Sequence, residues 1–374
     1  MKLYLIAGEA SGDLHTSNLM KELKHLEPGL QFRCWGGDLM QAQGGEIVKH
    51  YRDLAFMGFA EVLANIGTIV ANIKHCKADI LDYRPDAVIL IDYPGFNLRM
   101  AAFAKKAGFR VFYYISPQVW AWKKSRVLKI KRYVDRMFVI LPFEKEFYAR
   151  YDYEVDFVGH PLLDALDSLP GSGWDQFSKL NGLNEKPVVA LLPGSRKQEI
   201  RKVLPIMLSV VSKFPGHQFV VGCAPGLKPG FYQQLIGSNS IKMIEGQTYN
   251  LLRHARAALV TSGTATLETA LFEVPEVVCY KGGYISYEIA KRVVDRSMIR
   301  FISLVNLIMD REVVKELIQD DLTPANVERE LRKILENEDH RHNILNDYAL
   351  LKTRLGGGGA SAKTAREIIK MMTS

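Results

Sequence analysis

The sequence predicts an α/β protein built from two successive doubly wound domains with parallel sheets. Short apolar runs alternate with helical patterns along almost the whole chain, which is typical of parallel α/β architecture. Several runs, such as AVILID and RMFVIL, are continuously apolar, as strands are when helices cover both faces of their sheet. A chain of 374 residues is also too long for most single cores. Two domains of ordinary size follow from these observations.

The first half carries six expected strands, and a linker follows at Ser168–Trp174, where SLPGSGW combines Pro with two Gly. These strands are Lys2–Ala7, Gln31–Trp35, Ala87–Asp92, Arg110–Ser116, Arg136–Leu141 and Val155–Gly159. The pattern then restarts with strands at Pro187–Leu192, Gln218–Val221, Lys242–Ile244, Ala257–Val260 and Glu276–Tyr280.

These elements define the expected domains. We expect an N-terminal domain over residues 1–167, a C-terminal domain over 175–340, and C-terminal helices over 341–374 that could pack back on the first domain. The run Gly356–Gly359 should break the helix that precedes it.

Composition narrows the class of protein. Apolar residues make up 48% and charged residues 24%, as in a globular protein, and the formal charge of +8 suits an anionic partner such as a nucleotide, a phospholipid surface or nucleic acid. The four cysteines include no CxxC pair, which argues against a disulfide framework or a zinc site. No signal peptide is visible, and Glu61 interrupts the nearly uncharged stretch Leu54–Ile73, which argues against a spanning helix. We therefore expect a cytoplasmic protein that could be peripheral to a membrane.

Three junctions between a strand and a helix are candidates for chemistry, because ligands of such folds bind at the carboxyl ends of strands. They are LIAGEASGDLH, LLPGSRKQEI and LVTSGTATLE. The second and third suggest a diphosphate site formed by Gly194, Ser195, Arg196, Ser262, Gly263 and Thr264, with Glu268 placed to accept hydrogen bonds from ribose hydroxyls. Helix caps and an ordinary turn are the competing interpretation of the same residues.

Acidic residues after two strands of the first domain are candidate general bases. Asp92 ends a buried strand in ILIDYPGFN, and it either caps the next helix or acts as a base. Its position alone leaves both interpretations open, and Glu9 and Asp13 share the same ambiguity.

An aromatic and basic segment and an apolar segment each allow two interpretations. Trp120 and Trp122 precede seven basic residues between Lys123 and Arg136, which suits a headgroup interface or an anionic ligand as well as a solvated helix face. Phe56–Ile73 suits a core helix or a lipid groove, and its spacing favours the core.

Several motifs are absent from the sequence. It contains no Walker A sequence, no HExxH, no GxSxG and no DxD, so we expect neither a metal nor a cofactor. A GxGxxA match over Gly357–Ala362 follows no expected strand and carries no weight.

A series of motifs runs across nearly the whole chain: GEASGD at 8–13, MGFAEVL at 57–63, IDYPGFN at 91–97, SPQVWAW at 116–122, LPFEKEFY at 141–148, FVGHPLLDA at 157–165, LLPGSR at 191–196, SGTATLE at 262–268, and SLVNLI through REVVKEL at 303–317. In this order the motifs resemble the lipid-A-disaccharide synthase family of glycosyltransferases. The resemblance implies a GT-B fold with two Rossmann-like domains facing across a cleft, the second of which holds UDP.

The resemblance also implies the reaction and its residues. An inverting transfer would move 2,3-diacylglucosamine from its UDP conjugate to the 6-hydroxyl of 2,3-diacylglucosamine 1-phosphate, which gives the disaccharide phosphate and UDP. The implied catalytic residues are Asp92, Glu9 and Asn306, and the UDP site is the set of junction residues named above. The acceptor and membrane set is Ser11, Met57, Trp120, Trp122, Lys123, Lys124 and Arg126. Gly95 departs from the DxPDFN form of many members, so any role of a second carboxylate there is in doubt.

The resemblance further implies an anionic inner-membrane surface as partner, no nucleic acid, and a homodimer as an open alternative. The rival interpretations are another GT-B enzyme, such as the muramyl-pathway N-acetylglucosaminyltransferase or a UDP-sugar 2-epimerase, and a protein that binds nucleotide sugars without turnover. A basic nucleic-acid-binding protein is a third rival, but no nucleic-acid module is recognisable.

Overall fold

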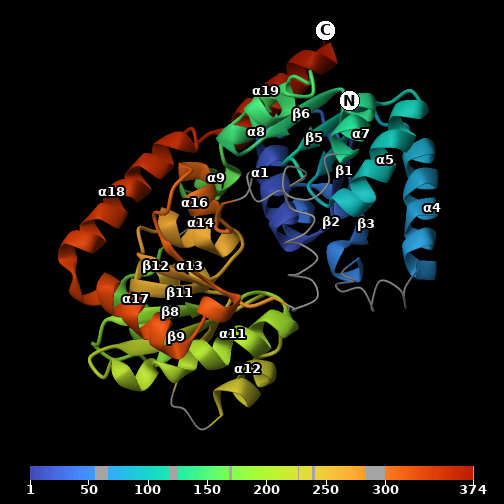
Figure 1. Ribbon diagram of the computed structural model, residues 1–374. Helices are drawn as coiled ribbons and strands as arrows, with labels where there is room; N and C mark the ends of the chain where they lie inside the picture. The colour runs from blue at the N-terminus through green and yellow to red at the C-terminus, as the bar shows by residue number, and fades with distance from the viewer. Residues whose placement is uncertain are drawn as a thin grey trace. The chain divides into compact units, whose positions relative to one another are not determined.

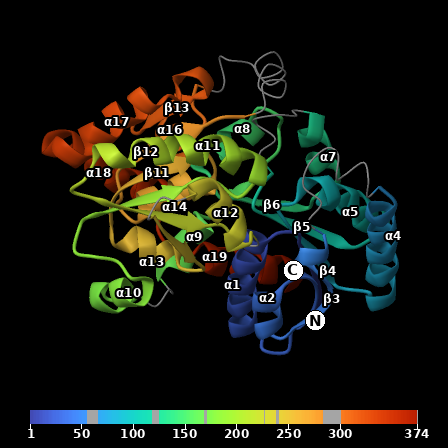
Figure 2. The ribbon, with the colours of Figure 1, turned by 90° about the horizontal axis from the view of Figure 1, so that it is seen from below.

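The computed structural model describes residues 1–54, 66–117, 125–167, 171–225, 227–237, 241–282 and 300–373. The chain forms two units, of which unit 1 comprises Met1–Leu169 and Leu355–Ser374 and unit 2 comprises Pro170–Arg354. Each unit has one parallel sheet with helices packed on it (Figures 1 and 2). The predicted α/β class with two parallel, doubly wound sheets is confirmed.

Unit 1 contains a seven-stranded sheet in the order β3-β2-β1-β4-β5-β6-β7. The apolar run AVILI forms the central strand β4. All five of its residues are buried, as expected for a strand of a parallel sheet that is covered on both faces. The strands are β1 (Lys2–Ala7), β2 (Gln31–Gly36), β3 (Gly45–His50), β4 (Ala87–Ile91), β5 (Arg110–Tyr114), β6 (Arg136–Val139) and β7 (Asp156–Phe157).

The order of strands in this sheet reverses between β1 and β4. Ala7 of β1 pairs with Ile91 of β4, so these neighbouring parallel strands end side by side. In doubly wound sheets, the reversal of strand order opens a crevice outside the carboxyl ends of the strands, where ligands bind. Glu9 and Asp92 follow these two strands and therefore emerge at that crevice.

Helices of unit 1 include one from the far end of the chain. They are α1 (Ala10–Leu26), α2 (Asp38–Ala42), α4 (Ile66–Tyr83), α5 (Pro94–Lys106), α7 (Ser125–Tyr133), α8 (Pro142–Ala149), α9 (Pro161–Asp167) and α19 (Ala360–Thr373), with a short 3₁₀ turn η1 (Tyr51–Asp53). The C-terminal helix α19 packs against α1 and α9 (Figure 2).

The return of the chain to unit 1 depends on a carboxylate and a glycine. Asp164 accepts hydrogen bonds from the backbone N–H groups of Gly359, Ala360 and Ser361 at 2.5, 3.3 and 2.8 Å, so it caps α19. Gly159 has φ +95°, and a Cβ there would lie 3.3 Å from the carbonyl oxygen of Gly357. The Gly-rich stretch that matches GxGxxA is thus a turn whose N–H groups are held by a protein carboxylate.

Asp164→Ala should lower the stability of unit 1, because it leaves the N–H groups at the start of α19 without their acceptor. Loss of a capping carboxylate costs about 2 kcal/mol, which corresponds to a fall in Tm of about 4–8 °C. Circular dichroism melting measures the shift, and Asp175→Ala, at an exposed position in the first turn of an unrelated helix, is the control. Equal melting temperatures for Asp164→Ala and the control would contradict the capping role.

Unit 2 contains a six-stranded sheet in the order β10-β9-β8-β11-β12-β13, which reverses between β8 and β11. Leu192 of β8 pairs with Val260 of β11, so the predicted diphosphate loops follow two adjacent strands. The strands are β8 (Val188–Leu192), β9 (Gln218–Cys223), β10 (Lys242–Glu245), β11 (Ala255–Thr261), β12 (Glu276–Tyr280) and β13 (Lys315–Ile318). The helices are α10 (Trp174–Asn181), α11 (Lys197–Ser209), α12 (Pro229–Ile236), α13 (Thr248–Arg253), α14 (Thr264–Leu271), α16 (Leu304–Met309), α17 (Pro324–Glu336) and α18 (Glu338–Arg354), with 3₁₀ turns η2 (Val211–Lys213) and η3 (Gln319–Asp321).

The last two helices belong to different units, which corrects the expectation of one C-terminal segment over 341–374. Helix α18 stays with unit 2, where Tyr348 is buried and Asp347 pairs with Arg311. Gly356–Gly359 ends this helix region as predicted, and only the following α19 joins unit 1.

Two edge strands, β3 and β13, are missing from the sequence-based expectation. Each lies at the edge of its sheet and carries charged residues, as in KELI, where only one residue is buried. Edge strands are commonly polar, and their apolar signal is weak for that reason. Within the residues that the structure describes, no helix is both long and apolar enough to cross a bilayer.

Candidate active site

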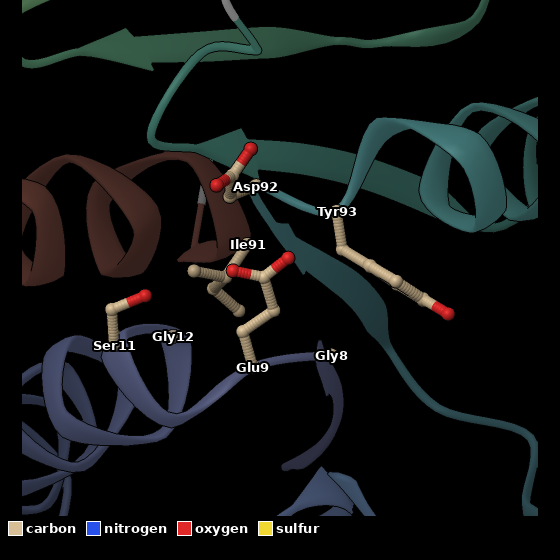
Figure 3. Close-up of a pocket in the computed structure, with 7 residues that line it drawn as sticks. All are labelled: Gly8, Glu9, Ser11, Gly12, Ile91, Asp92 and Tyr93. Carbon is tan, nitrogen blue, oxygen red and sulfur yellow. The ribbon is translucent and has the colours of Figure 1, made fainter. Parts of the chain in front are cut away.

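A pocket lies at the strand reversal of unit 1 and brings together two of the predicted catalytic residues. Figure 3 shows the Glu9 side chain extending from the start of α1 toward the end of β4, where Asp92 stands. Tyr93 points to another side, away from Asp92. The lining residues are Gly8, Glu9, Ser11, Gly12, Ile91, Asp92 and Tyr93. The acceptor candidate Ser11 thus shares this pocket with the two carboxylates.

The electrostatics of the pocket suit Asp92 to proton transfer near neutral pH. Burial, together with the charge of Glu9, raises the pKa of Asp92 from 3.8 to about 7, and the backbone N–H of Tyr93 opposes that rise. A base whose pKa lies near the working pH combines a useful fraction of carboxylate with a good affinity for the proton.

The backbone at Asp92 is held in an unusual conformation. Asp92 and Tyr93 both have positive φ, 42° and 47°, in the left-handed region that non-glycine residues rarely occupy. The amide Nδ2 of Asn97 donates to the carbonyl oxygens of Ile91 at 3.0 Å and Asp92 at 2.8 Å. Non-glycine residues in this region cluster at functional sites, where the surrounding structure keeps them in place.

Helix capping, the alternative interpretation of Asp92, is not what the structure shows. Tyr93 occupies the N-cap of α5, and Asp92 lies one residue before it. The carboxylate of Asp92 instead lines the pocket. Its position therefore fits a base better than a cap.

Asp13 has a structural role, which removes it from the candidate bases. It is buried, and its carboxylate accepts N–H groups from Gly37 at 2.8 Å, Leu39 at 3.1 Å and Met40 at 3.1 Å. These donors belong to the start of α2, so Asp13 caps that helix. A carboxylate with these bonds is poorly placed to accept a substrate proton.

Most of the acceptor and membrane set lies outside the described residues: Met57, Trp120, Trp122, Lys123 and Lys124. Arg126 is described on α7, where it is partly exposed. Its charge acts to lower the pKa of Tyr113, so the guanidinium lies near β5, the strand beside β4.

The predicted diphosphate residues lie at the strand reversal of unit 2. Gly194 follows β8 with φ +106°, and a Cβ there would lie 3.2 Å from Oε2 of Glu199 and 3.4 Å from Cγ2 of Thr261. Only glycine suits this turn and this close approach. Arg196 begins α11 with an exposed side chain, and its Nη1 lies 3.2 Å from Oε1 of Glu199. Ser195 is exposed beside it.

The second loop of this site follows β11 and begins α14. Gly263 and Thr264 are exposed, whereas Ser262 donates its hydroxyl to the carbonyl oxygen of Ile302 at 2.8 Å. The hydroxyl hydrogen of Ser262 therefore already has a protein acceptor. Glu268 accepts a hydrogen bond from the hydroxyl of Tyr249 at 3.2 Å, and burial raises its pKa.

Asn306, which the resemblance gives as a catalytic residue, lies inside unit 2. Its side chain is fully buried. Its Nδ2 donates to the carbonyl oxygen of Val314 and to Glu316, both at 2.9 Å, and its Oδ1 accepts the N–H groups of Val313 and Val314. These bonds tie α16 to β13 and so support the loop near Ser262.

Three residues at the unit 2 site were not singled out from the sequence. Glu199 contacts Arg196, and the charges of both act on Tyr280 at the end of β12. Thr261 is buried, and its hydroxyl has no hydrogen-bond partner among the described residues. The run VTSGT contained the signal for Thr261, since it directly precedes Ser262. Within the described part of the chain, no cluster of His, Cys, Asp and Glu could hold a metal ion.

The raised pKa of Asp92 predicts how activity depends on pH. Because the base acts as the carboxylate, kcat/KM should rise with pH up to about 7 and fall about tenfold for each unit below that value. Glu9→Gln removes a neighbouring charge that raises the pKa of Asp92, so the acid limb should move to lower pH. An acid limb that stays in place in Glu9→Gln would contradict this coupling.

The same shift predicts a stability difference between the wild type and Asp92→Asn. The folded-state pKa lies above the ordinary 3.8, so the folded protein binds the proton more tightly, and the stabilisation present below pH 4 is lost as pH rises to about 7. At pH 8 the substitution should stabilise the protein, by up to about 4 kcal/mol. Urea unfolding at pH 4 and pH 8 measures the difference.

Comparisons with known proteins agree with this architecture. The chain is 38% identical to the lipid-A-disaccharide synthase of Geobacter metallireducens over 99% of this chain and 97% of the relative, and 40% identical to that of Syntrophus aciditrophicus over 96% and 95%. The structure of UDP-GlcNAc 2-epimerase from Neisseria meningitidis bound to UDP-GlcNAc shares the fold, with a TM-score of 0.68 at 14% identity over 99% of this chain and 100% of that one. The family model for lipid-A-disaccharide synthetase matches residues 3–368. The chain therefore belongs to the lipid-A-disaccharide synthetase family of glycosyltransferases.

Proposed function

We propose that the protein transfers 2,3-diacylglucosamine from UDP-2,3-diacylglucosamine to the 6-hydroxyl of 2,3-diacylglucosamine 1-phosphate, with inversion and release of UDP. Family membership supports the reaction, and the observation that carries the mechanism is the pocket that pairs Asp92 with Glu9 at the strand reversal of unit 1. In this proposal unit 1 binds the acceptor and unit 2 binds the UDP moiety of the donor.

Asp92 acts as general base in this reaction. A sugar hydroxyl is a poor nucleophile, and a carboxylate that takes its proton during attack lowers the barrier. The new bond joins the acceptor O6 to the anomeric carbon of the donor while the bond from that carbon to the UDP oxygen breaks. Burial, with a smaller contribution from the charge of Glu9, keeps the pKa of Asp92 high, so that Asp92 holds the proton it receives.

The leaving UDP gains negative charge in the same step. Arg196 at the start of α11 and the N–H groups that begin α14 are placed to stabilise that charge. Glu268, fixed by Tyr249, accepts ribose hydroxyls in this proposal. In this proposal these groups stabilise the leaving UDP without a metal.

Mixing the purified chain with both lipid substrates tests the function. The experiment is run in EDTA, and mass spectrometry should find the disaccharide phosphate together with stoichiometric UDP. UDP-N-acetylglucosamine as sole substrate is the control, because a 2-epimerase would convert it. Epimerisation without disaccharide, or UDP binding without turnover, would overturn the proposal.

We further propose that the enzyme works on an anionic inner-membrane surface, since both substrates carry acyl chains. Helix α7 presents exposed Lys129, Lys131 and Arg132 beside the partly exposed Arg126. Sedimentation of the purified chain separately distinguishes a monomer from the homodimer that the resemblance left open.

Neutral substitutions at Lys123, Lys124, Arg126 and Lys129 should weaken binding to anionic vesicles. Each basic residue near such a surface contributes on the order of 1 kcal/mol, so the loss of four should be large. Flotation with phosphatidylglycerol vesicles measures it. The control removes the same charge from exposed positions of unit 2: Lys179, Lys186, Lys213 and Lys242. Equal binding by the two variants would contradict a specific membrane-facing cluster.

A further inference from the structure

The backbone of Asp92 needs an external support. Two consecutive non-glycine residues, Asp92 and Tyr93, lie in the left-handed region, and each costs about 1–3 kcal/mol that contacts with the surroundings must offset. The carboxylate that lines the pocket depends on this conformation, because the peptide at the end of β4 determines where the side chain points. A residue that fixes this peptide therefore also fixes the direction of the Asp92 carboxylate.

The carbonyl oxygen of Asp92 receives a hydrogen bond from the neighbouring strand. Tyr113, the second-last residue of β5, donates its hydroxyl to that oxygen at 2.5 Å. Tyr113 is fully buried, and it pairs in register with Leu90, two residues before Asp92. The bond thus joins the strained residue to the rigid centre of the sheet.

Asn97, the other donor to this carbonyl, is shared among several acceptors. The two hydrogens of its Nδ2 serve the carbonyl oxygens of Ile6, Ile91 and Asp92, at 3.3, 3.0 and 2.8 Å. Asn97 is also only five residues from Asp92, on the helix that Asp92 precedes, so it moves with the turn. Tyr113 supplies the shortest of these bonds, from a different element.

The surroundings of Tyr113 keep it a hydrogen-bond donor. Asp92 and Tyr148 face it from the ends of β4 and α8, Arg126 faces it from α7, and Asn97 from α5. Burial and the charge of Asp92 raise the pKa of Tyr113 well above its usual range, and the opposing effect of Arg126 is smaller. The phenol stays protonated over the working pH range.

We infer that Tyr113 is a positioning residue for the reaction: its hydroxyl fixes the left-handed peptide of Asp92, so that the carboxylate points at the acceptor hydroxyl. This inference rests on the proposed function for its kinetic consequences. The sequence gives no local sign of it, because Tyr113 lies in an apolar strand 21 residues from Asp92.

Tyr113→Phe removes only the hydroxyl and should lower kcat roughly tenfold, since a small misplacement of a catalytic group can cost up to about 10²-fold. KM for both substrates and the Kd of UDP should stay unchanged. The acid limb of kcat should also move to lower pH, as the released turn exposes the Asp92 carboxylate to water. A purely structural role would lower the melting temperature without moving the acid limb.

Tyr148→Phe is the matched control. Tyr148 is also fully buried in this core, and its hydroxyl lies 2.8 Å from Oγ of Ser116 rather than on Asp92. Its substitution should leave the acid limb in place. In the Asp92→Asn background, Tyr113→Phe should cause no further loss of kcat, because both changes act through one group. Additive losses, or an unchanged kcat in Tyr113→Phe, would overturn the inference.

Two further measurements keep the inference separate from the function and from folding. Carbon-13 NMR titration of the Asp92 carboxyl, assigned by its loss in Asp92→Asn, should show a lower pKa in Tyr113→Phe without any substrate, and an unshifted titration overturns the inference. If the wild type makes no disaccharide, only the proposed function fails. If Tyr113→Phe does not fold, 4-fluorophenylalanine at position 113 keeps the ring and fills the space of the hydroxyl but cannot donate, and an unchanged kcat with that residue overturns the inference.

Discussion

Asp92→Asn should abolish most turnover while the protein folds and binds UDP normally. Proton removal by a positioned carboxylate contributes about 10²–10⁴-fold, so kcat should fall by that factor. The amide is nearly isosteric and cannot accept the proton as a base. UDP binding should be unchanged, because the proposed UDP residues lie in unit 2 and Asp92 lies in unit 1. Single-turnover kinetics and calorimetric titration with UDP measure the two quantities.

The alternatives to Asp92 as base are now fewer than the sequence left open. Asp13 is engaged with three backbone N–H groups of the α2 region, so a fully active Asp92→Asn enzyme would leave Glu9 as the remaining carboxylate of this pocket. Glu9→Gln is therefore the matched variant. If Asp92 is the base, Glu9→Gln should keep substantial activity with a displaced acid limb. If Glu9 is the base, Glu9→Gln should lose most of its turnover and Asp92→Asn should keep substantial activity.

Arg196→Ala should weaken UDP binding or slow turnover by about 2–3 kcal/mol, which is roughly 30–150-fold. Its guanidinium is 68% exposed and carries only one ion pair at 3.2 Å, to Glu199. Such a pair is worth little by itself, so the group is available to a diphosphate. Because Arg196 begins α11, a ligand there also meets the positive end of that helix.

Lys197→Ala is the control for this prediction. It removes one positive charge from the same end of α11, but Lys197 lies over the ring of Phe231. A general effect of charge would weaken UDP binding equally in both variants. Arg196→Lys keeps the charge and loses the planar fork, so it should recover only part of the binding. A UDP molecule found in unit 1 would contradict the whole assignment.

The sequence by itself determined the class of fold and the loops that are candidates for chemistry. Continuous apolar runs such as β4 show a strand covered on both faces, and these patterns depend on neighbouring residues alone. The motifs after β1, β4, β8 and β11 marked both strand reversals, since glycine and polar residues follow each strand directly. The polar edge strands β3 and β13 were not predicted from the sequence, because their local apolar pattern is weak.

Only the tertiary structure decided which polar side chains are free for a ligand. Asp13, Ser262 and Asn306 are residue types that often bind ligands or act in catalysis. In this structure, however, each side chain is hydrogen-bonded to other atoms of the protein. The partners of Asp164 and Tyr113 lie 195 and 21 residues away from them. A hydrogen bond is short-ranged in space and indifferent to separation along the chain, so the fold has to bring its two partners together before either role can be assigned.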